Sequence, residues 1–136
     1  MSNTQKIVKT SELFINHDKL KDYHSLIIKS IKELEDEYQN NLCSEMFGVI
    51  LSKITYLGFQ YFNEVEEYMF QCNYPKIEVH RKEYLDYSTK VIDYNIDYQK
   101  IKNPVVIIDF LKKWWTNHKT IMGTDCEKYV NSLFLN

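Results

Sequence analysis

Three of the four histidines in this 136-residue chain stand where helical patterns call for apolar residues. His24, His80 and His118 each interrupt a row of apolar residues spaced three or four apart, and Asp125 continues the last of these rows. A buried neutral imidazole costs about 1–3 kcal/mol for each ring nitrogen left without a partner. Because one metal ion would satisfy several imidazoles at once, the pattern predicts a metal site built from the three histidines and the aspartate. The competing interpretation is that each imidazole bonds to a backbone carbonyl or a tyrosine hydroxyl.

Four amphipathic stretches would have to position these side chains. Their apolar residues recur at steps of three and four, the period of one face of an α-helix. We expect a first helix at about residues 18–38 and a second helix that ends at about residue 71. The third and fourth helices should begin after Pro75 and Pro104, because proline suits the first turn of a helix. The predicted inward rows are Leu20, His24, Ile27, Ile31, Leu34 and Tyr38; Phe47, Ile50, Ile54, Leu57, Tyr61, Val65, Tyr68 and Cys72; Ile77, His80, Tyr84, Tyr87, Val91 and Tyr94; and Ile107, Leu111, Trp114, His118, Ile121 and Asp125.

The length and composition fit a single domain. Three glycines and two prolines are too few for the turns of a β-sandwich or a barrel, whereas four helices with short connections pack naturally as an antiparallel bundle. The sequence therefore predicts an all-α, up-down-up-down four-helix bundle over residues 17–136, preceded by an N-terminal arm over residues 1–16.

Four segments of the chain, taken in order, carry a resemblance to a known family. They are residues 20–26 (LKDYHSL), 61–69 (YFNEVEEYM), 74–84 (YPKIEVHRKEY) and 110–118 (FLKKWWTNH), with Gly123-Thr124-Asp125 downstream. Together they resemble the helix signatures of the hemerythrin and bacteriohemerythrin family, which include the runs HFxxEExxM, YPxxxxHxxxH and FLxxWLxxH. The resemblance extends over about residues 16–129 and implies the same four-helix bundle.

The resemblance also implies a non-haem diiron centre, in which five histidines and two bridging carboxylates hold iron that binds O₂ reversibly. His24, His80 and His118 match ligand positions of the first, third and fourth helices. The family's bridging aspartate lies five residues after the last histidine, which is Gly123 here, whereas Asp125 lies seven residues after it. Asp125 can still face inward if the helix continues, because a step of seven residues returns nearly to the same helix face.

Three of the ligand positions implied by the resemblance carry other residues. Tyr61 and Tyr84 stand where histidines are expected, and Val65 stands where the bridging glutamate is expected. A tyrosine phenolate is a hard oxygen ligand that favours Fe(III), whereas O₂ binding needs Fe(II). Val65 cannot bind a metal, and Glu64 could replace the missing carboxylate only if the helix rotated locally. The ordinary diiron centre is therefore predicted to be weakened or absent.

Three interpretations of the function follow. In the first, the chain is a hemerythrin-like metal-binding protein that binds or senses O₂ or another small diatomic through a remodelled, mononuclear or asymmetric iron site; its candidate ligands are His24, His80, His118, Asp125, Tyr61 and Tyr84. In the second, no metal is bound, the tyrosine hydroxyls bond to the imidazoles, and the bundle is a binding or interaction module. In the third, rearranged ligands form an ordinary diiron O₂ carrier, which the residue chemistry disfavours. The residues leave the first two interpretations open.

Other features argue against several classes of protein. The formal net charge of −2 gives no reason to expect nucleic acid or an acidic membrane as partner. No stretch approaches the roughly 20 apolar residues of a membrane span, and the first residues lack the apolar core of a secretory signal. Cys43, Cys72 and Cys126 lack a CxxC spacing and are expected to be reduced thiols of a cytoplasmic protein. No nucleophile–base pair, phosphate-binding glycine loop or thiol redox motif is present, so an enzyme is not expected.

Overall fold

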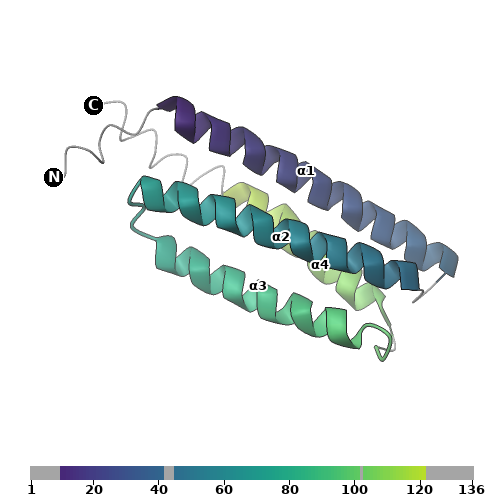
Figure 1. Ribbon diagram of the computed structural model, residues 1–136. Helices are drawn as coiled ribbons and strands as arrows, with labels where there is room; N and C mark the ends of the chain where they lie inside the picture. The colour runs from purple at the N-terminus through teal and green to yellow at the C-terminus, as the bar shows by residue number, and fades with distance from the viewer. Residues whose placement is uncertain (1–9, 42–44, 102, 122–136) are drawn as a thin grey trace.

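The computed structural model describes residues 10–41, 45–101 and 103–121, with side chains at 19–40, 45–101 and 103–117. Its elements are the helices α1 (Thr10–Asn41), α2 (Glu45–Gln71), α3 (Ile77–Asp97) and α4 (Val105–Ile121). Figure 1 shows them side by side with alternating directions, α4 lying behind α2 in this view. None of these helices, over the part described, is long and apolar enough to cross a lipid bilayer. The predicted all-α four-helix bundle is confirmed.

The apolar rows predicted for the first three helices form most of the buried core. The α2 row is buried along its whole length, from Phe47 to Cys72. In the α1 row only His24 and Tyr38 are half-buried, and the α3 row is buried in its middle, from His80 to Val91. The helical period in the sequence therefore identified the inward faces correctly.

The fourth helix turns a different tryptophan inward from the one in the predicted row. Trp115 has no exposed surface, whereas Trp114 is half-buried and packs against the ring of Tyr87 with 4.4 Å between the ring centroids. Adjacent helical residues point about 100° apart, so only one of the two can face the centre of the bundle. The buried Ile108 and Leu111 put that centre closer to the direction of Trp115.

The helix ends follow the local signals in the sequence. Asn73 has a φ of +53°, and the N–H of Tyr74 donates to the carbonyl of Met69 at 2.9 Å, an arrangement that closes the C-terminus of α2. At the start of α4, the Asn103 Oδ1 accepts a hydrogen bond from the N–H of Val105 at 3.2 Å. Both predicted breaks are therefore confirmed.

The first helix begins earlier than expected. It starts at Thr10 rather than near residue 18, so residues 10–16, which were predicted to form part of an N-terminal arm, are helical and continuous with α1. Residues 1–9 of the predicted arm lie outside the described residues.

Cys72 is a buried free thiol at the end of α2, as expected of a reduced cysteine. Burial raises the pKa of this thiol to about 11, because the thiolate would lose its hydration. The thiol therefore stays protonated and unreactive near neutral pH. Cys43 and Cys126 lie outside the described residues.

Candidate functional site

His24 lies on the inward side of α1 and makes a hydrogen bond to the backbone of α4. Its Nε2 lies 3.1 Å from the carbonyl oxygen of Trp115. Because a carbonyl oxygen can only accept, Nε2 must carry the proton, and the lone pair of the neutral ring lies on Nδ1. In this arrangement Nε2 is not available to a metal ion, and His24 makes the backbone hydrogen bond of the competing interpretation.

His80 is buried on the inward face of α3, with 4% of its surface exposed. Its ring lies 5.7 Å from the ring of Tyr74 and 6.1 Å from the ring of Tyr84, measured between centroids. Its Nδ1 lies 3.9 Å from an oxygen of Glu83, one helical turn further along. This imidazole therefore lies beside two tyrosine rings and one carboxylate.

Stacked aromatic rings occupy the interior between these two histidines. The rings of Phe62 and Tyr84 are nearly parallel with centroids 4.2 Å apart, and Phe62 is also nearly parallel to Trp115 at 5.7 Å. Trp115 contacts His24 at one end of this series, with 6.1 Å between ring centroids, and Tyr84 contacts His80 at the other. Trp115, Phe62 and Tyr84, here called the aromatic stack, thus run in contact from one imidazole to the other.

A buried hydrogen bond fixes the orientation of the central tryptophan. The Trp115 Nε1 donates to the hydroxyl of Tyr87 at 2.9 Å. Burial also raises the pKa of the Tyr87 hydroxyl, because the phenolate would be stripped of water, so it stays neutral. Gly58 makes room for this pair, since a Cβ there would lie 3.2 Å from the Trp115 ring. The indole is therefore held as a structural element of the core.

The positions that depart from the resemblance are packed as core residues. Tyr61 is buried, with its ring edge-on to Trp115 at 5.2 Å, and Val65 has no exposed surface. Glu64 points away from the interior, because its carboxylate lies 2.9 Å from the ammonium of Lys19 on α1. In the structure, α2 is therefore not rotated in the way that would turn Glu64 inward to supply the missing carboxylate.

The structure describes the side chains of four of the six predicted metal ligands. Among the residues with described side chains, no three His, Cys, Asp or Glu residues lie close enough together to hold a metal ion. The backbone of His118 belongs to α4, but its side chain is outside the described residues, as is the whole of Asp125. Of the predicted ligands, the structure therefore describes His24, His80, Tyr61 and Tyr84, and it connects them through aromatic contacts.

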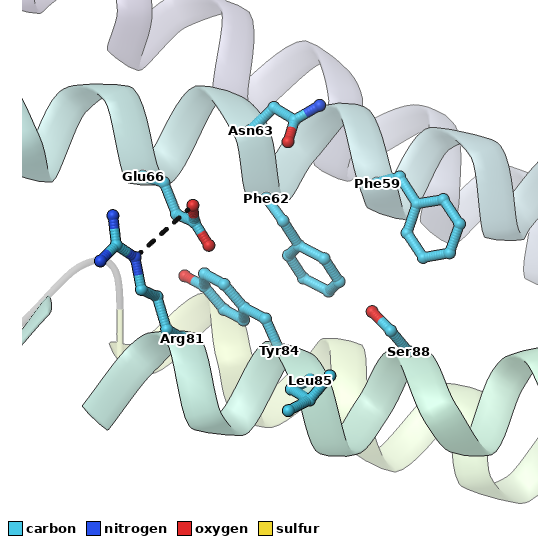
Figure 2. Close-up of a pocket in the computed structure, with 8 residues that line it drawn as sticks. All are labelled: Phe59, Phe62, Asn63, Glu66, Arg81, Tyr84, Leu85 and Ser88. Carbon is cyan, nitrogen blue, oxygen red and sulfur yellow. Dashed lines mark ion pairs between the residues drawn. The ribbon is translucent and has the colours of Figure 1, made fainter. Parts of the chain in front are cut away.

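A groove between α2 and α3 was not predicted from the sequence. It has a volume of about 380 Å³ and opens to solvent; its walls are Phe59, Phe62, Asn63 and Glu66 of α2 and Arg81, Tyr84, Leu85 and Ser88 of α3. Figure 2 shows aromatic rings in its middle and the ion pair of Glu66 and Arg81, 3.8 Å apart, at one end. Polar residues in apolar rows predicted only an interior site. The sequence signal for the groove is of the opposite kind, because apolar residues such as Leu85 lie on a helix face that is otherwise polar.

Comparisons of the chain with protein-family models, with curated proteins and with solved structures gave no match. The resemblance to hemerythrins therefore stays a prediction that rests on four sequence segments. What the bundle can do follows from the geometry of its interior and of the groove.

Proposed function

We propose that this chain is a four-helix bundle without a diiron centre that acts as a binding module, with the α2–α3 groove as its binding site. The aromatic stack is the observation that supports the first part of this proposal. It fills the interior between His24 and His80, where a metal shared by these histidines would have to lie. The groove supports the second part, because its size and its mixture of aromatic and polar walls are typical of ligand sites.

Packing energetics favour this function over a diiron centre. Three large rings with almost no exposed surface stabilise the fold through their burial, by roughly 1.5–3 kcal/mol per fully buried side chain. A metal ion between His24 and His80 would displace part of this stack and break the hydrogen bond from the His24 ring to the Trp115 carbonyl. The interior therefore serves to hold the helices in register.

One observation favours a second candidate, in which iron is retained. His80 is buried on the face of α3 that packs against α4, the helix that also carries His118. A mononuclear site would use His24, His80 and His118, with Asp125, Tyr61 or Tyr84 as a further ligand. Such a site would bind O₂ or another small diatomic only in its ferrous form.

Anaerobic reconstitution with Fe(II) distinguishes the two candidates. After removal of free metal, we expect less than about 0.1 iron per chain, because no described cluster of ligands can hold the ion. The matched variant combines Tyr61→His, Val65→Glu and Tyr84→His, which restores the ligands that the resemblance implies at these three positions. It should bind more iron than the parent chain. One or two irons per parent chain, lost on His80→Ala, would refute the proposal and support the second candidate.

A further inference from the structure

Three exposed apolar residues form a row along the outer side of α3. Leu85, Ile92 and Ile96 are 66%, 43% and 70% exposed and lie at steps of seven and four residues, which puts them on one face of the helix. Single exposed apolar residues are common, whereas apolar residues gathered on one face of a helix are a candidate contact surface. The row extends over about 16 Å, the length of three helical turns.

The apolar row continues across the groove onto α2. Phe59 lines the groove, and Tyr56, one turn before it, is 62% exposed. A hydrogen bond shows which parts of the two helices lie opposite each other: the Asn95 Nδ2 of α3 donates to the hydroxyl of Thr55 of α2 at 2.7 Å. Tyr56 follows Thr55 and therefore lies at the same height along the pair as Ile92 and Ile96, which are within one helical turn of Asn95. We call Tyr56, Phe59, Leu85, Ile92 and Ile96 the outer face of the α2–α3 pair.

An acidic row accompanies this outer face. Asp86, Asp93 and Asp97 each follow one residue of the apolar row, so they repeat at the same steps and are exposed. At 100° per residue they lie on the side of the apolar row away from α2. Among the described residues, no basic side chain forms an ion pair with these carboxylates. The three carboxylates outnumber Lys82 and Lys90, the exposed lysines beside them, so this side of α3 keeps a net negative charge that attracts cations.

We propose that the outer face of the α2–α3 pair binds an amphipathic helix that carries lysine or arginine beside its apolar stripe. Two packed antiparallel helices leave a groove that a third helix can enter, and its apolar side chains at steps of three and four would meet Leu85, Ile92 and Tyr56. One bulky side chain would occupy the pocket between Phe59 and Leu85. The basic residues would pair with the acidic row. This inference rests on the proposed function and names the partner of its binding site.

The test uses two synthetic helical peptides of about 16 residues. Both carry leucine at the steps of the apolar row, and they differ only in having lysine or glutamate beside each leucine. Fluorescence anisotropy with the full chain should give at least about tenfold tighter binding of the lysine peptide. Leu85→Glu should weaken that binding by about tenfold or more, because it puts a charge on the apolar row beside the pocket. The control is Ile28→Glu, at a residue of α1 that is 41% exposed, which should leave binding unchanged.

Charge reversal tests the acidic row separately. The double variant Asp86→Lys with Asp93→Lys should bind the glutamate peptide more tightly than the lysine peptide. Asp109→Lys, an exposed carboxylate on α4, should leave the preference of the parent chain intact. A preference for one peptide that reverses in the double variant and persists in the Asp109→Lys variant could not come from apolar contacts alone.

Several outcomes would overturn the inference. They are equal affinity for the two peptides, equal binding by the Leu85→Glu and Ile28→Glu variants, and no binding of either peptide up to about 1 mM. A dimer of the parent chain that Leu85→Glu separates into monomers would assign the face to a second copy instead. The iron content of the same preparations tests the diiron part of the proposed function independently, so the two failures are distinguishable.

Discussion

The inner and outer sides of the α2–α3 pair are both rich in apolar and aromatic residues, yet they differ in what covers them. On the inner side, Phe62 and Tyr84 stack on each other and on Trp115 of α4. On the outer side, Tyr56 and Leu85 are mostly exposed, and the rest of the chain described by the structure leaves them uncovered. The difference shows that apolar content alone does not make a core, because a side chain becomes core only when another element packs on it.

The largest expected difference between the two sides comes from truncating an aromatic ring on each. Trp115→Ala should lower the free energy of unfolding by about 3–5 kcal/mol, because it removes a fully buried ring and leaves a cavity. Phe70→Ala, at a ring that is 69% exposed on α2, should change it by less than about 0.5 kcal/mol. Urea denaturation of both variants measures the contrast. Equal losses would mean that the stack does not stabilise the bundle.

A carboxylate introduced on each side of α2 should give the next largest contrast. Val65→Glu buries a carboxylate and should destabilise the fold by about 3 kcal/mol at pH 7, whereas Val49→Glu, at a 60% exposed position, should be nearly neutral.

The pH dependence of this contrast follows from the same burial. In the Val65→Glu variant, burial raises the pKa of the introduced carboxyl above its unfolded value of about 4.3, so the part of the penalty that comes from charge is absent at lower pH and grows as the pH rises through that value. Denaturation at pH 4 and pH 7 checks the sign. A penalty at pH 7 that Fe(II) abolishes would instead indicate that iron enters the interior.

Removal of a single hydroxyl should distinguish the two sides more finely. Tyr87→Phe leaves the buried Trp115 indole N–H without its acceptor and should cost about 1–3 kcal/mol, whereas Tyr56→Phe should be neutral. Because the folded-state pKa of Tyr87 is raised by burial, its contribution is present below about pH 10 and is lost above it. Tyr87→Phe should therefore also make the loss of stability at alkaline pH shallower, which thermal unfolding at pH 9 and 11 would reveal.

The smallest effect is expected at a buried serine of α1. The Ser30 hydroxyl is buried and makes no hydrogen bond, so Ser30→Ala should stabilise the bundle by about 0.5 kcal/mol through lower desolvation cost and better helix propensity. Ser25→Ala, on the exposed side of the same helix, isolates the propensity part. A clear loss of stability on Ser30→Ala, with none on Ser25→Ala, would mean that the hydroxyl has a partner in solution.

The sequence alone determined the number of helices, the inward faces of the first three and two of their connections. The steps of three and four that pass through Val65 and Val91 follow directly from the geometry of a single helix, and the breaks at Asn73 and Asn103 follow from local capping. These features are local, so a short window of sequence contains everything that decides them. The early start of α1 was not predicted, because residues 10–17 carry no comparable row.

Only the tertiary structure decided what the interior and the surface of the bundle can do. Whether His24 and His80 converge, whether Trp114 or Trp115 faces the centre, and whether Leu85 is covered all depend on how the helices rotate and lie against one another. That rotation is set by the summed packing of many side chains from all four helices, with no single segment responsible. The sequence could nominate His24, His80 and His118 as metal ligands, but it could not foresee that Trp115 and Phe62 would lie between the first two of them.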